Sequence, residues 1–252
     1  MDIVVITGAS AGLGKHFLEE VVNKTPLPDE IWLIARRGDR LQALADAYPQ
    51  MKFRCLSLDL QKEESYNQYA HLLEETGAHV RLLINNAGYG KLGEFVNGQC
   101  GEQTGMVDLN CRALTAMTLL SLPHMDRGSG ILNVCSIAAF APTPRMTVYC
   151  STKAYVYSFS KSLRRELKSR GIRVLVTCPG PMSTEFLDVA DIVGRSKTFQ
   201  TLPYCDPKRV AAHSLKRLER GRGIHVERLF YKFYHLLAKL LPHSLVMYMS
   251  ET

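Results

Sequence analysis

Six short apolar runs, each followed by a longer amphipathic or mixed segment, constrain the fold of this 252-residue chain more than any other feature. The runs are rich in Val, Ile and Leu without strict polar alternation, as strands buried on both faces of a parallel sheet are. They span residues 3–6, 31–35, 53–58, 80–84, 130–134 and 172–177. The intervening segments predict helices near residues 12–24, 39–47, 61–75, 103–121, 148–169 and 206–220. This alternation predicts an α/β fold, with a doubly wound parallel sheet and right-handed crossovers that place helices on both faces.

Composition excludes several other classes of protein. Apolar residues make up 46% and charged residues 22% of the chain, which argues against general disorder. No run of apolar residues is long enough to predict a membrane-spanning helix, and the first residues are typical of a mature strand rather than a signal peptide. The seven cysteines are scattered and show no zinc-ligand spacing. We therefore expect a cytoplasmic protein with free thiols and no metal site.

The first apolar run ends in the sequence TGASAGLG, residues 7–14. Three glycines lie where a strand must turn into a helix, and small residues there let backbone N–H groups approach a pyrophosphate. The spacing is G-x3-G-x-G rather than the commoner G-x-G-x-x-G, and the alternative is a tight turn without a ligand. Its place between the first strand and the first helix favours a dinucleotide site formed by Gly8, Ser10, Gly12, Leu13 and Gly14.

The end of the second predicted strand indicates which dinucleotide is bound. A site that prefers NAD carries Asp or Glu near this point, where this chain has Ala35 followed by Arg36 and Arg37. Guanidinium groups suit a 2′-phosphate because they form charge-assisted, bidentate hydrogen bonds. The alternative is an ordinary solvated corner between strand and helix. We favour NADP(H), bound through Arg36 and Arg37.

Four polar residues form a candidate catalytic set. Tyr149 and Lys153 stand four residues apart and therefore share one face of a helix. A phenol with a pKa of about 10 is a poor acid–base group at neutral pH, and a neighbouring ammonium lowers that pKa. Ser136 ends the fifth predicted strand, at the edge where parallel sheets bind ligands. Asn110 lies inside a predicted helix, where Asn is only a middling helix former.

Taken together, these motifs resemble the short-chain dehydrogenase/reductase family. The resemblance covers residues 2–185 closely and rests on the glycine turn, the sequence Asn85-Asn86-Ala87-Gly88, the four candidate catalytic residues and the pair Pro179-Gly180, in the family's order. It implies a Rossmann-type sheet of about seven parallel strands, the last near residues 224–226. It also implies a single domain over residues 1–226, followed by an apolar and basic extension over 227–252.

The resemblance implies a role for each catalytic position. Tyr149 would donate a proton to a carbonyl in reduction, or act as the base in oxidation. Lys153 would bind the nicotinamide ribose and lower the pKa of Tyr149. Ser136 would hold and polarise the substrate oxygen, and Asn110 would keep a water beside Lys153 in a proton relay. Three neighbouring cysteines, Cys111, Cys135 and Cys150, are expected to take no part in the reaction.

The resemblance also assigns cofactor contacts. Asp59 would meet the adenine, and Asn86, Ala87 and Gly88 would line the adenosine ribose and stabilise the sheet. The loop that contains Pro179 and Gly180 would meet the nicotinamide, with Thr184 near the phosphates. Arg36 is the first candidate for the 2′-phosphate. Many family members that use NADP also carry a basic residue where this chain has Ala11, so the preference depends mainly on the two arginines.

The implied function is reduction of a ketone or aldehyde by NADPH, or the reverse reaction. The segment 183–204 covers the substrate in this family, and its apolar residues favour a lipophilic substrate; they are Phe186, Leu187, Val189, Ile192, Val193, Phe199 and Leu202. The alternative is a non-catalytic dinucleotide sensor or scaffold, which has no need of the catalytic residues. Nucleic-acid binding is disfavoured, because the basic excess of +7 is modest and no such motif is present.

The C-terminal extension departs from many family members. Its large apolar residues fall on one helical stripe that ends at Pro242; they are Leu229, Phe230, Phe233, Leu236, Leu237, Leu240 and Leu241. We expect this stripe to pack on its own domain or on a partner subunit. The alternatives are a lid over an apolar substrate and a peripheral membrane contact, in which Lys and Arg face the headgroups. A homodimer through the helices near 103–121 and 148–169 is expected, whereas the family's usual tetramer contacts are in doubt.

Overall fold

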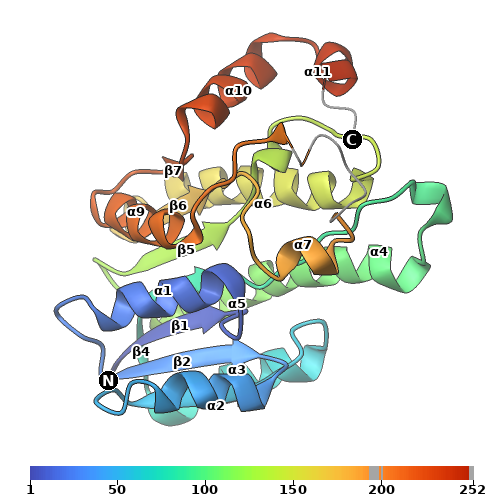
Figure 1. The fold of residues 1–252 in the computed structure, drawn as a ribbon. Helices are drawn as coiled ribbons and strands as arrows, with labels where there is room; N and C mark the ends of the chain where they lie inside the picture. The colour runs from blue at the N-terminus through green and yellow to red at the C-terminus, as the bar shows by residue number, and fades with distance from the viewer. Residues whose placement is uncertain (193–198, 200, 250–252) are drawn as a thin grey trace.

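The computed structural model describes residues 1–192, 199 and 201–249, and its centre is a sheet of seven parallel strands (Figure 1). The strand order is β3-β2-β1-β4-β5-β6-β7. The order reverses beside β1, whose carboxyl end lies between β2 and β4, and this is where such sheets bind ligands. The strands are β1 (Asp2–Thr7), β2 (Glu30–Ala35), β3 (Phe53–Ser57), β4 (His79–Asn85), β5 (Gly130–Val134), β6 (Arg173–Thr177) and β7 (Ile224–His225). The predicted fold class is confirmed.

Helices cover both faces of the sheet, because alternate residues of each strand point to opposite faces. Val4 and Ile6 pack in the core beneath α1 (Gly12–Val22), α2 (Gly38–Asp46) and α9 (Pro207–Glu219). Ile3 and Val5 pack in the core on the other face, to which α3 (Glu63–Thr76), α5 (Leu114–Ser121) and α6 (Thr147–Glu166) contribute. Both faces of the strands are therefore buried, which explains their continuous apolar sequence.

The helix predicted over residues 103–121 is interrupted in the structure. Its first part is α4 (Cys100–Val107), which is followed by a π-helical turn, η2 (Asp108–Ala113), and then by α5. Such turns are often found at functional sites, and this one contains Asn110. Short 3-10 turns are η1 (Phe95–Asn97), η3 (Leu122–His124) and η4 (Ile137–Ala139). Among the described residues, no helix is both long enough and apolar enough to cross a bilayer.

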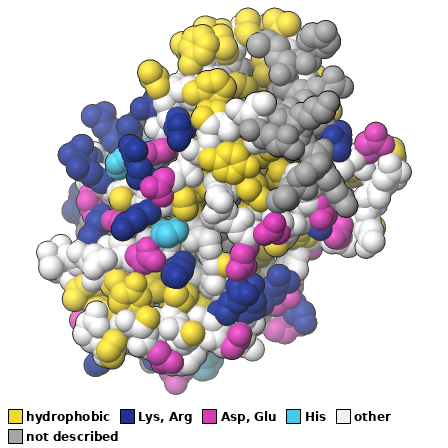
Figure 2. All heavy atoms as spheres, viewed as in Figure 1, with side chains coloured by type: hydrophobic (Ala, Val, Ile, Leu, Met, Phe, Trp, Pro, Cys, Tyr) yellow, Lys and Arg dark blue, Asp and Glu magenta, His cyan; other side chains and the backbone are white. Residues whose placement is uncertain are grey.

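The end of the chain forms two helices, α10 (Leu229–Leu240) and α11 (His243–Met249), that stand beyond the sheet, and the short helix α7 (Phe186–Val189) follows β6 (Figure 1). The predicted stripe packs on its own domain only in part, through residues such as Leu237 and Leu241, and packing on a partner subunit stays a prediction. Tyr231, Ala238 and Val246 also enter the core, because the ring of Tyr231 fits against the bare backbone of Gly180. The rest of the stripe has exposed side chains, at Leu229, Phe230, Phe233, Leu236 and Leu240. Hydrophobic side chains therefore gather over α10 and α11 (Figure 2).

Candidate active site

A cavity of about 740 Å³ lies along the carboxyl ends of the strands. This volume is within the range of small-molecule and cofactor sites. The cavity brings together most of the site residues predicted from the sequence: Gly8, Ser10, Gly12, Leu13, Arg36, Arg37, Asp59, Asn86, Ala87, Gly88, Ser136, Tyr149, Lys153, Pro179, Gly180 and Thr184. Gly14 and Asn110 do not line it and act through their neighbours.

The glycine turn leaves no room for side chains. Gly8 and Gly12 have φ of +64° and +54°, which L-residues with side chains rarely adopt. A Cβ on Gly8 would lie 2.8 Å from the Cα of Ala87, and one on Gly14 would lie 2.3 Å from the carbonyl oxygen of Gly8. The turn therefore presents bare backbone at the start of α1, which is the cradle that a pyrophosphate needs. These residues fit a nicotinamide dinucleotide.

Hydrogen bonds tie the glycine turn to the end of β4. The Asn86 side-chain amide donates to the carbonyl oxygens of Thr7 and Gly8, each at 3.0 Å. The Thr7 hydroxyl accepts from the backbone N–H groups of Asn86 and Ala87, also at 3.0 Å. The Asn86 side chain thus links the end of β4 to the end of β1 and fixes the shape of the glycine turn.

The three central catalytic candidates lie together on the floor of the cavity. Ser136 follows β5, and its hydroxyl caps η4 by accepting from the Ala138 N–H at 3.2 Å. Tyr149 and Lys153 lie one turn apart on α6, and the Tyr149 hydroxyl is hydrogen-bonded to Ser136. The Lys153 Nζ donates to the Val134 carbonyl oxygen at 3.1 Å and lies 5.7 Å from the centre of the Tyr149 ring. The end of β5 and the helix α6 thus place the phenol of Tyr149, the hydroxyl of Ser136 and the ammonium of Lys153 close together.

The protein environment shifts the pKa of Tyr149 in the direction opposite to that expected. Burial raises the pKa of this phenol, and the hydrogen bond with Ser136 opposes the rise only in part. Burial also lowers the pKa of Lys153, because desolvation disfavours its charge. The expected lowering of the Tyr149 pKa by Lys153 is therefore not found, and burial sets the direction of the shift. A phenol that stays protonated at neutral pH donates a hydrogen bond, but its raised pKa makes proton transfer harder.

Asn110 is buried behind the floor of the cavity and joins two elements. Its side-chain oxygen accepts from the Tyr89 N–H at 3.0 Å, and its amide donates to the Tyr89 carbonyl oxygen at 2.9 Å and to the Thr152 hydroxyl at 3.0 Å. A Cβ on Gly88 would lie 2.8 Å from the Asn110 oxygen and 3.5 Å from the Lys153 Nζ. Asn110 is thus close to the lysine, and the π-helical turn turns its side chain toward the loop after β4.

One charged group at the rim of the cavity was not predicted. The Glu185 carboxylate pairs with the Arg37 guanidinium at 3.1 Å and with that of Arg40 at 2.7 Å. The two arginines lower the pKa of Glu185. Arg37 also donates to the Ser10 hydroxyl at 3.4 Å, whereas the Arg36 side chain has no hydrogen bond or ion pair within the described part of the chain. The sequence analysis missed Glu185 because it lies 148 residues from Arg37.

The other end of the cavity is apolar and includes the chain's last helices. The segment 183–204 contributes Phe186, Val189, Phe199 and Leu202, and Val193 lies outside the described residues. The C-terminal helices and their linker contribute Phe230, Phe233, Leu237, Leu241 and Val246. Part of the predicted stripe therefore lines the cavity while its outer side faces solvent. Helical periodicity alone could not distinguish these two surroundings.

Known proteins resemble this chain in sequence and in structure. The family model described as short chain dehydrogenase matches residues 2–191. An oxidoreductase of Staphylococcus aureus (strain MRSA252) is 26% identical over 232 residues, which cover 90% of this chain and 95% of that protein. The 17-beta-hydroxysteroid dehydrogenase type 3 of Mus musculus is 33% identical over 189 residues, which cover 71% of this chain and 60% of that protein. A short-chain dehydrogenase from Sphingobium yanoikuyae, solved in complex with NADPH, superimposes with a TM-score of 0.80 at 26% identity, covering 95% of this chain and 94% of that one.

Proposed function

Because the chain belongs to the short-chain dehydrogenase family, and is therefore an oxidoreductase that acts on CH–OH or C=O groups with a nicotinamide dinucleotide, we propose that it reduces a lipophilic ketone or aldehyde with NADPH. The observation that carries the proposal is the juxtaposition of Tyr149, Ser136 and Lys153 in one cavity with the glycine turn. When bound, the cofactor supplies the hydride. The chain's own residues must then hold the substrate oxygen and move one proton.

Tyr149 is protonated at neutral pH and therefore holds the proton that a carbonyl oxygen would receive in the direction of reduction, although burial makes that proton harder to release. Its hydroxyl shares a hydrogen bond with Ser136, so a carbonyl oxygen placed between them would accept from both groups. Lys153 is 5% exposed, and its ammonium remains close enough to favour the phenolate that forms when the proton leaves. Asn110 is proposed to hold a water beside Lys153 that returns the proton from solvent.

The preference for NADP(H) is proposed to depend on Arg36 and Arg37 at the end of β2. Both line the cavity, and Arg40 adds a third positive charge at the same rim. The Glu185 carboxylate pairs with Arg37 and Arg40, which leaves the Arg36 guanidinium available for a 2′-phosphate. Asp59 and Thr184 are proposed to contact the adenine and the phosphates, since both line the same cavity.

The proposed function is tested by following NADPH consumption with ketones and aldehydes of graded hydrophobic bulk. We expect turnover that increases with apolar size, because large apolar side chains surround the substrate end of the cavity. The second candidate, a dinucleotide sensor or scaffold, predicts cofactor binding without turnover for every compound. Binding without turnover across the panel would thus overturn the proposal. The catalytic residues favour the enzyme.

Two surfaces are proposed as contacts. Val107, Leu119 and Tyr155 are exposed on neighbouring helices α4, α5 and α6, which supports a homodimer through these helices. The outer side of α10 exposes Leu229, Leu236 and Leu240, with exposed Lys232 and Lys239 on the same helix. We propose that this side lies on an anionic membrane surface, where apolar side chains insert and lysines meet headgroups. Vesicle sedimentation that is lost on truncation after Val226 would support this contact, and its absence at low salt would overturn it.

A further inference from the structure

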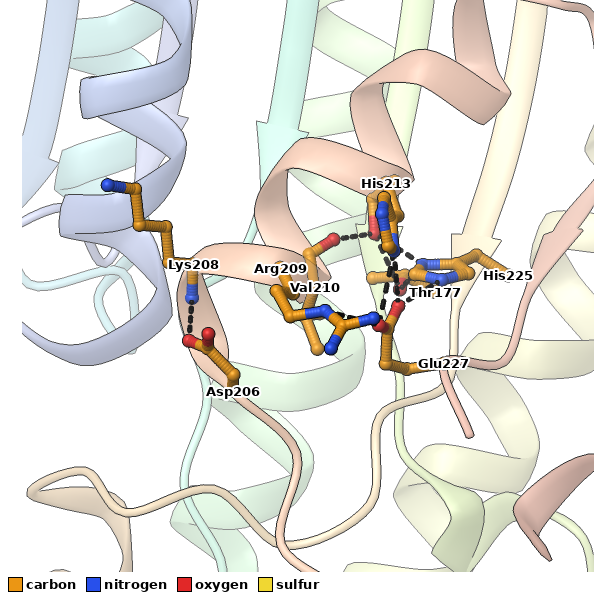
Figure 3. A network of polar contacts seen from close by, with 9 residues as sticks. Thr177, Asp206, Lys208, Arg209, Val210, His213, His225 and Glu227 are labelled. Atoms are coloured by element: carbon orange, nitrogen blue, oxygen red, sulfur yellow. Dashed lines mark hydrogen bonds and ion pairs between the residues drawn. The ribbon is translucent and has the colours of Figure 1, made fainter. Parts of the chain in front are cut away.

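Two histidines and a carboxylate converge at the end of β7, outside the cavity (Figure 3). His213 lies on α9, His225 ends β7, and Glu227 follows two residues later. The His213 Nδ1 lies 3.1 Å from Glu227 Oε1 and 2.9 Å from Oε2, and the His225 Nε2 lies 2.9 Å from Oε2. One ligand atom from each of the three residues fits within 4.8 Å of the others.

Neighbouring side chains fix the orientation of His225. Its Nδ1 lies 2.8 Å from the Ser214 hydroxyl and 3.2 Å from the Thr177 hydroxyl. The Ser214 hydroxyl is also 2.6 Å from the Val210 carbonyl oxygen, to which it donates. When the Nδ1–H of His225 donates to Ser214, its Nε2 lone pair is available to an ion; without an ion, the 2.9 Å contact with the Glu227 carboxylate requires the proton on Nε2. A hydrogen-bonded second ring nitrogen is typical of histidines that bind metals.

The charge of the Glu227 carboxylate is balanced only in part by a permanent cation. The Glu227 side chain is 7% exposed, and within the described ranges the one Lys or Arg within 4 Å is Arg209, whose Nε is 3.7 Å from Oε1. Arg209 itself is 67% exposed and therefore largely solvated. A buried carboxylate requires compensation by hydrogen bonds or by a cation. Two imidazoles supply hydrogen bonds but no permanent positive charge.

From this arrangement we infer that His213, His225 and Glu227 bind a divalent transition-metal ion of the zinc class. Two imidazole nitrogens and one carboxylate oxygen are a donor set that zinc takes, with a water as fourth ligand. Bond lengths of about 2.0–2.2 Å in a tetrahedral site separate ligand atoms by about 3.3 Å. The Glu227 oxygens are already within a few tenths of an ångström of that separation from both nitrogens. His213 is 46% exposed, so its ring can adjust.

The site joins α9 to the end of β7 and the chain that follows it, and lies close to the start of α10. His225 is held in the sheet, where Cys178 N–H donates to its carbonyl oxygen at 2.8 Å. Glu227 is two residues before Leu229, the first residue of α10. A bound ion would tie α9 to the segment that leads into α10, a helix that lines the cavity. The site lies outside the cavity, so a bound ion would act on the position of α10 and would take no part in the proposed reaction.

The test uses the full chain, stripped with a chelator and titrated with Zn²⁺ in competition with a chromophoric chelator. We expect one ion per chain and a rise in melting temperature of roughly 5–10 °C when free Zn²⁺ is a hundredfold above the Kd. Co²⁺ in the same site should give visible absorption bands of a low-coordinate N/O site. His213→Asn and Glu227→Gln should each weaken Zn²⁺ binding by at least about tenfold.

Two controls separate this site from other ligands. His71→Asn removes an exposed histidine that pairs with Glu75 on α3, and Zn²⁺ affinity should not change. Cys100→Ser removes the exposed thiol, and the stoichiometry should stay at one. Failure to bind Zn²⁺ would overturn the inference. So would binding that is unchanged in His213→Asn and Glu227→Gln but lost in Cys100→Ser, which would identify an adventitious ion only.

Discussion

At the glycine-turn end of the cavity, backbone atoms approach so closely that one added methyl group on Gly14 would lie 2.3 Å from a carbonyl oxygen. At the α10 end, Phe230 and Phe233 line the same cavity while 53% and 59% exposed. The first end is shaped by backbone geometry and binds a ligand whose form is fixed. The second is shaped by large side chains with room to move. The glycine-turn end and the α10 end of the cavity are therefore expected to tolerate amino-acid substitutions very differently.

The largest effect is expected at Tyr149, where the two ends meet. Tyr149→Phe removes the proton donor but keeps the ring that packs against Phe186. Turnover should fall by about 10²–10⁴-fold while cofactor affinity changes little. The measurement is steady-state NADPH oxidation alongside cofactor titration. Tyr155→Phe, on the exposed side of the same helix, is the control and should retain activity. A Tyr149→Phe variant with normal turnover would contradict the assignment.

The glycine-turn end of the cavity is tested by Gly14→Ala. The new Cβ must displace the backbone of Gly8, so the free energy of unfolding should drop by roughly 1–3 kcal/mol, and cofactor affinity should fall with it. Denaturant titration and cofactor binding measure the two effects. Gly101→Ala introduces a Cβ on α4 with nothing within 4 Å and should leave both unchanged or slightly improved. Equal behaviour of the two variants would remove the contrast between the ends.

Cofactor preference is tested by Arg36→Asp. Loss of a charge-assisted hydrogen bond to the 2′-phosphate should reduce the preference for NADP over NAD by about 10- to 100-fold. The measurement compares kcat/KM for both cofactors. Arg220→Asp makes the same charge change at the exposed residue that follows α9. It should leave the ratio of kcat/KM for the two cofactors unchanged. An unaltered ratio in Arg36→Asp would shift the assignment to Arg37.

The α10 end of the cavity is tested by Phe233→Ala. Loss of apolar contact should raise KM for a bulky ketone by about 3- to 10-fold, leave kcat nearly unchanged, and have little effect on a small aldehyde. Leu229→Ala is the matched control, since this leucine is 80% exposed on the same helix and does not line the cavity. A uniform loss for all substrates would indicate that Phe233 supports the fold rather than substrate size.

The smallest effect concerns the pH dependence of α10 docking. His235 stacks on Phe140 with ring centres 4.1 Å apart and is hydrogen-bonded to Tyr157 at 3.0 Å. Burial lowers its pKa from 6.5, and Lys239 and Lys161 act in the same direction. The docked helix therefore binds fewer protons than the undocked one. Docking is fully stable above pH 6.5 and weakens as the pH falls through and below 6.5.

Hydrogen-exchange protection factors of α10 amides measure this dependence. They should decline below pH 6.5 by less than about tenfold in the parent chain. His235→Phe keeps an aromatic ring against Phe140 but cannot titrate, so its protection factors should not depend on pH. A decline of the same size in both chains would show that another group is responsible.

The sequence predicted the sheet, the glycine turn and the Tyr–Lys pair better than it predicted the C-terminal helices, and the reason is physical. Strands buried on both faces, glycines at a turn and a Tyr–Lys pair one helical turn apart are local patterns with one common explanation each. The strand at 130–134 has the same bounds in the structure. Glu185 pairs with arginines from the other end of the chain, and no local pattern indicates such a contact.

The C-terminal helix shows where periodicity fails. The stripe of leucines and phenylalanines predicted the buried side of α10, yet Tyr231 and Ala238 face the core. Packing here is decided by the shape of the loop after β6, which accepts a flat ring. The cluster of His213, His225 and Glu227 was not predicted either, because His213 lies on α9 and the other two residues lie in the chain around β7. Only the fold brings His213 beside the other two.

The close seating of the Tyr231 ring on Gly180 has an evolutionary consequence. A Cβ at position 180 would lie 2.2 Å from the ring, so neither position can change freely while the other is kept. A descendant of this chain that gains a side chain at 180 must first give up the aromatic at 231, and with it the hydrogen bond from the Tyr231 hydroxyl to the Pro203 carbonyl oxygen. Position 231 on α10 and position 180 in the loop after β6 are therefore expected to change together in the course of evolution.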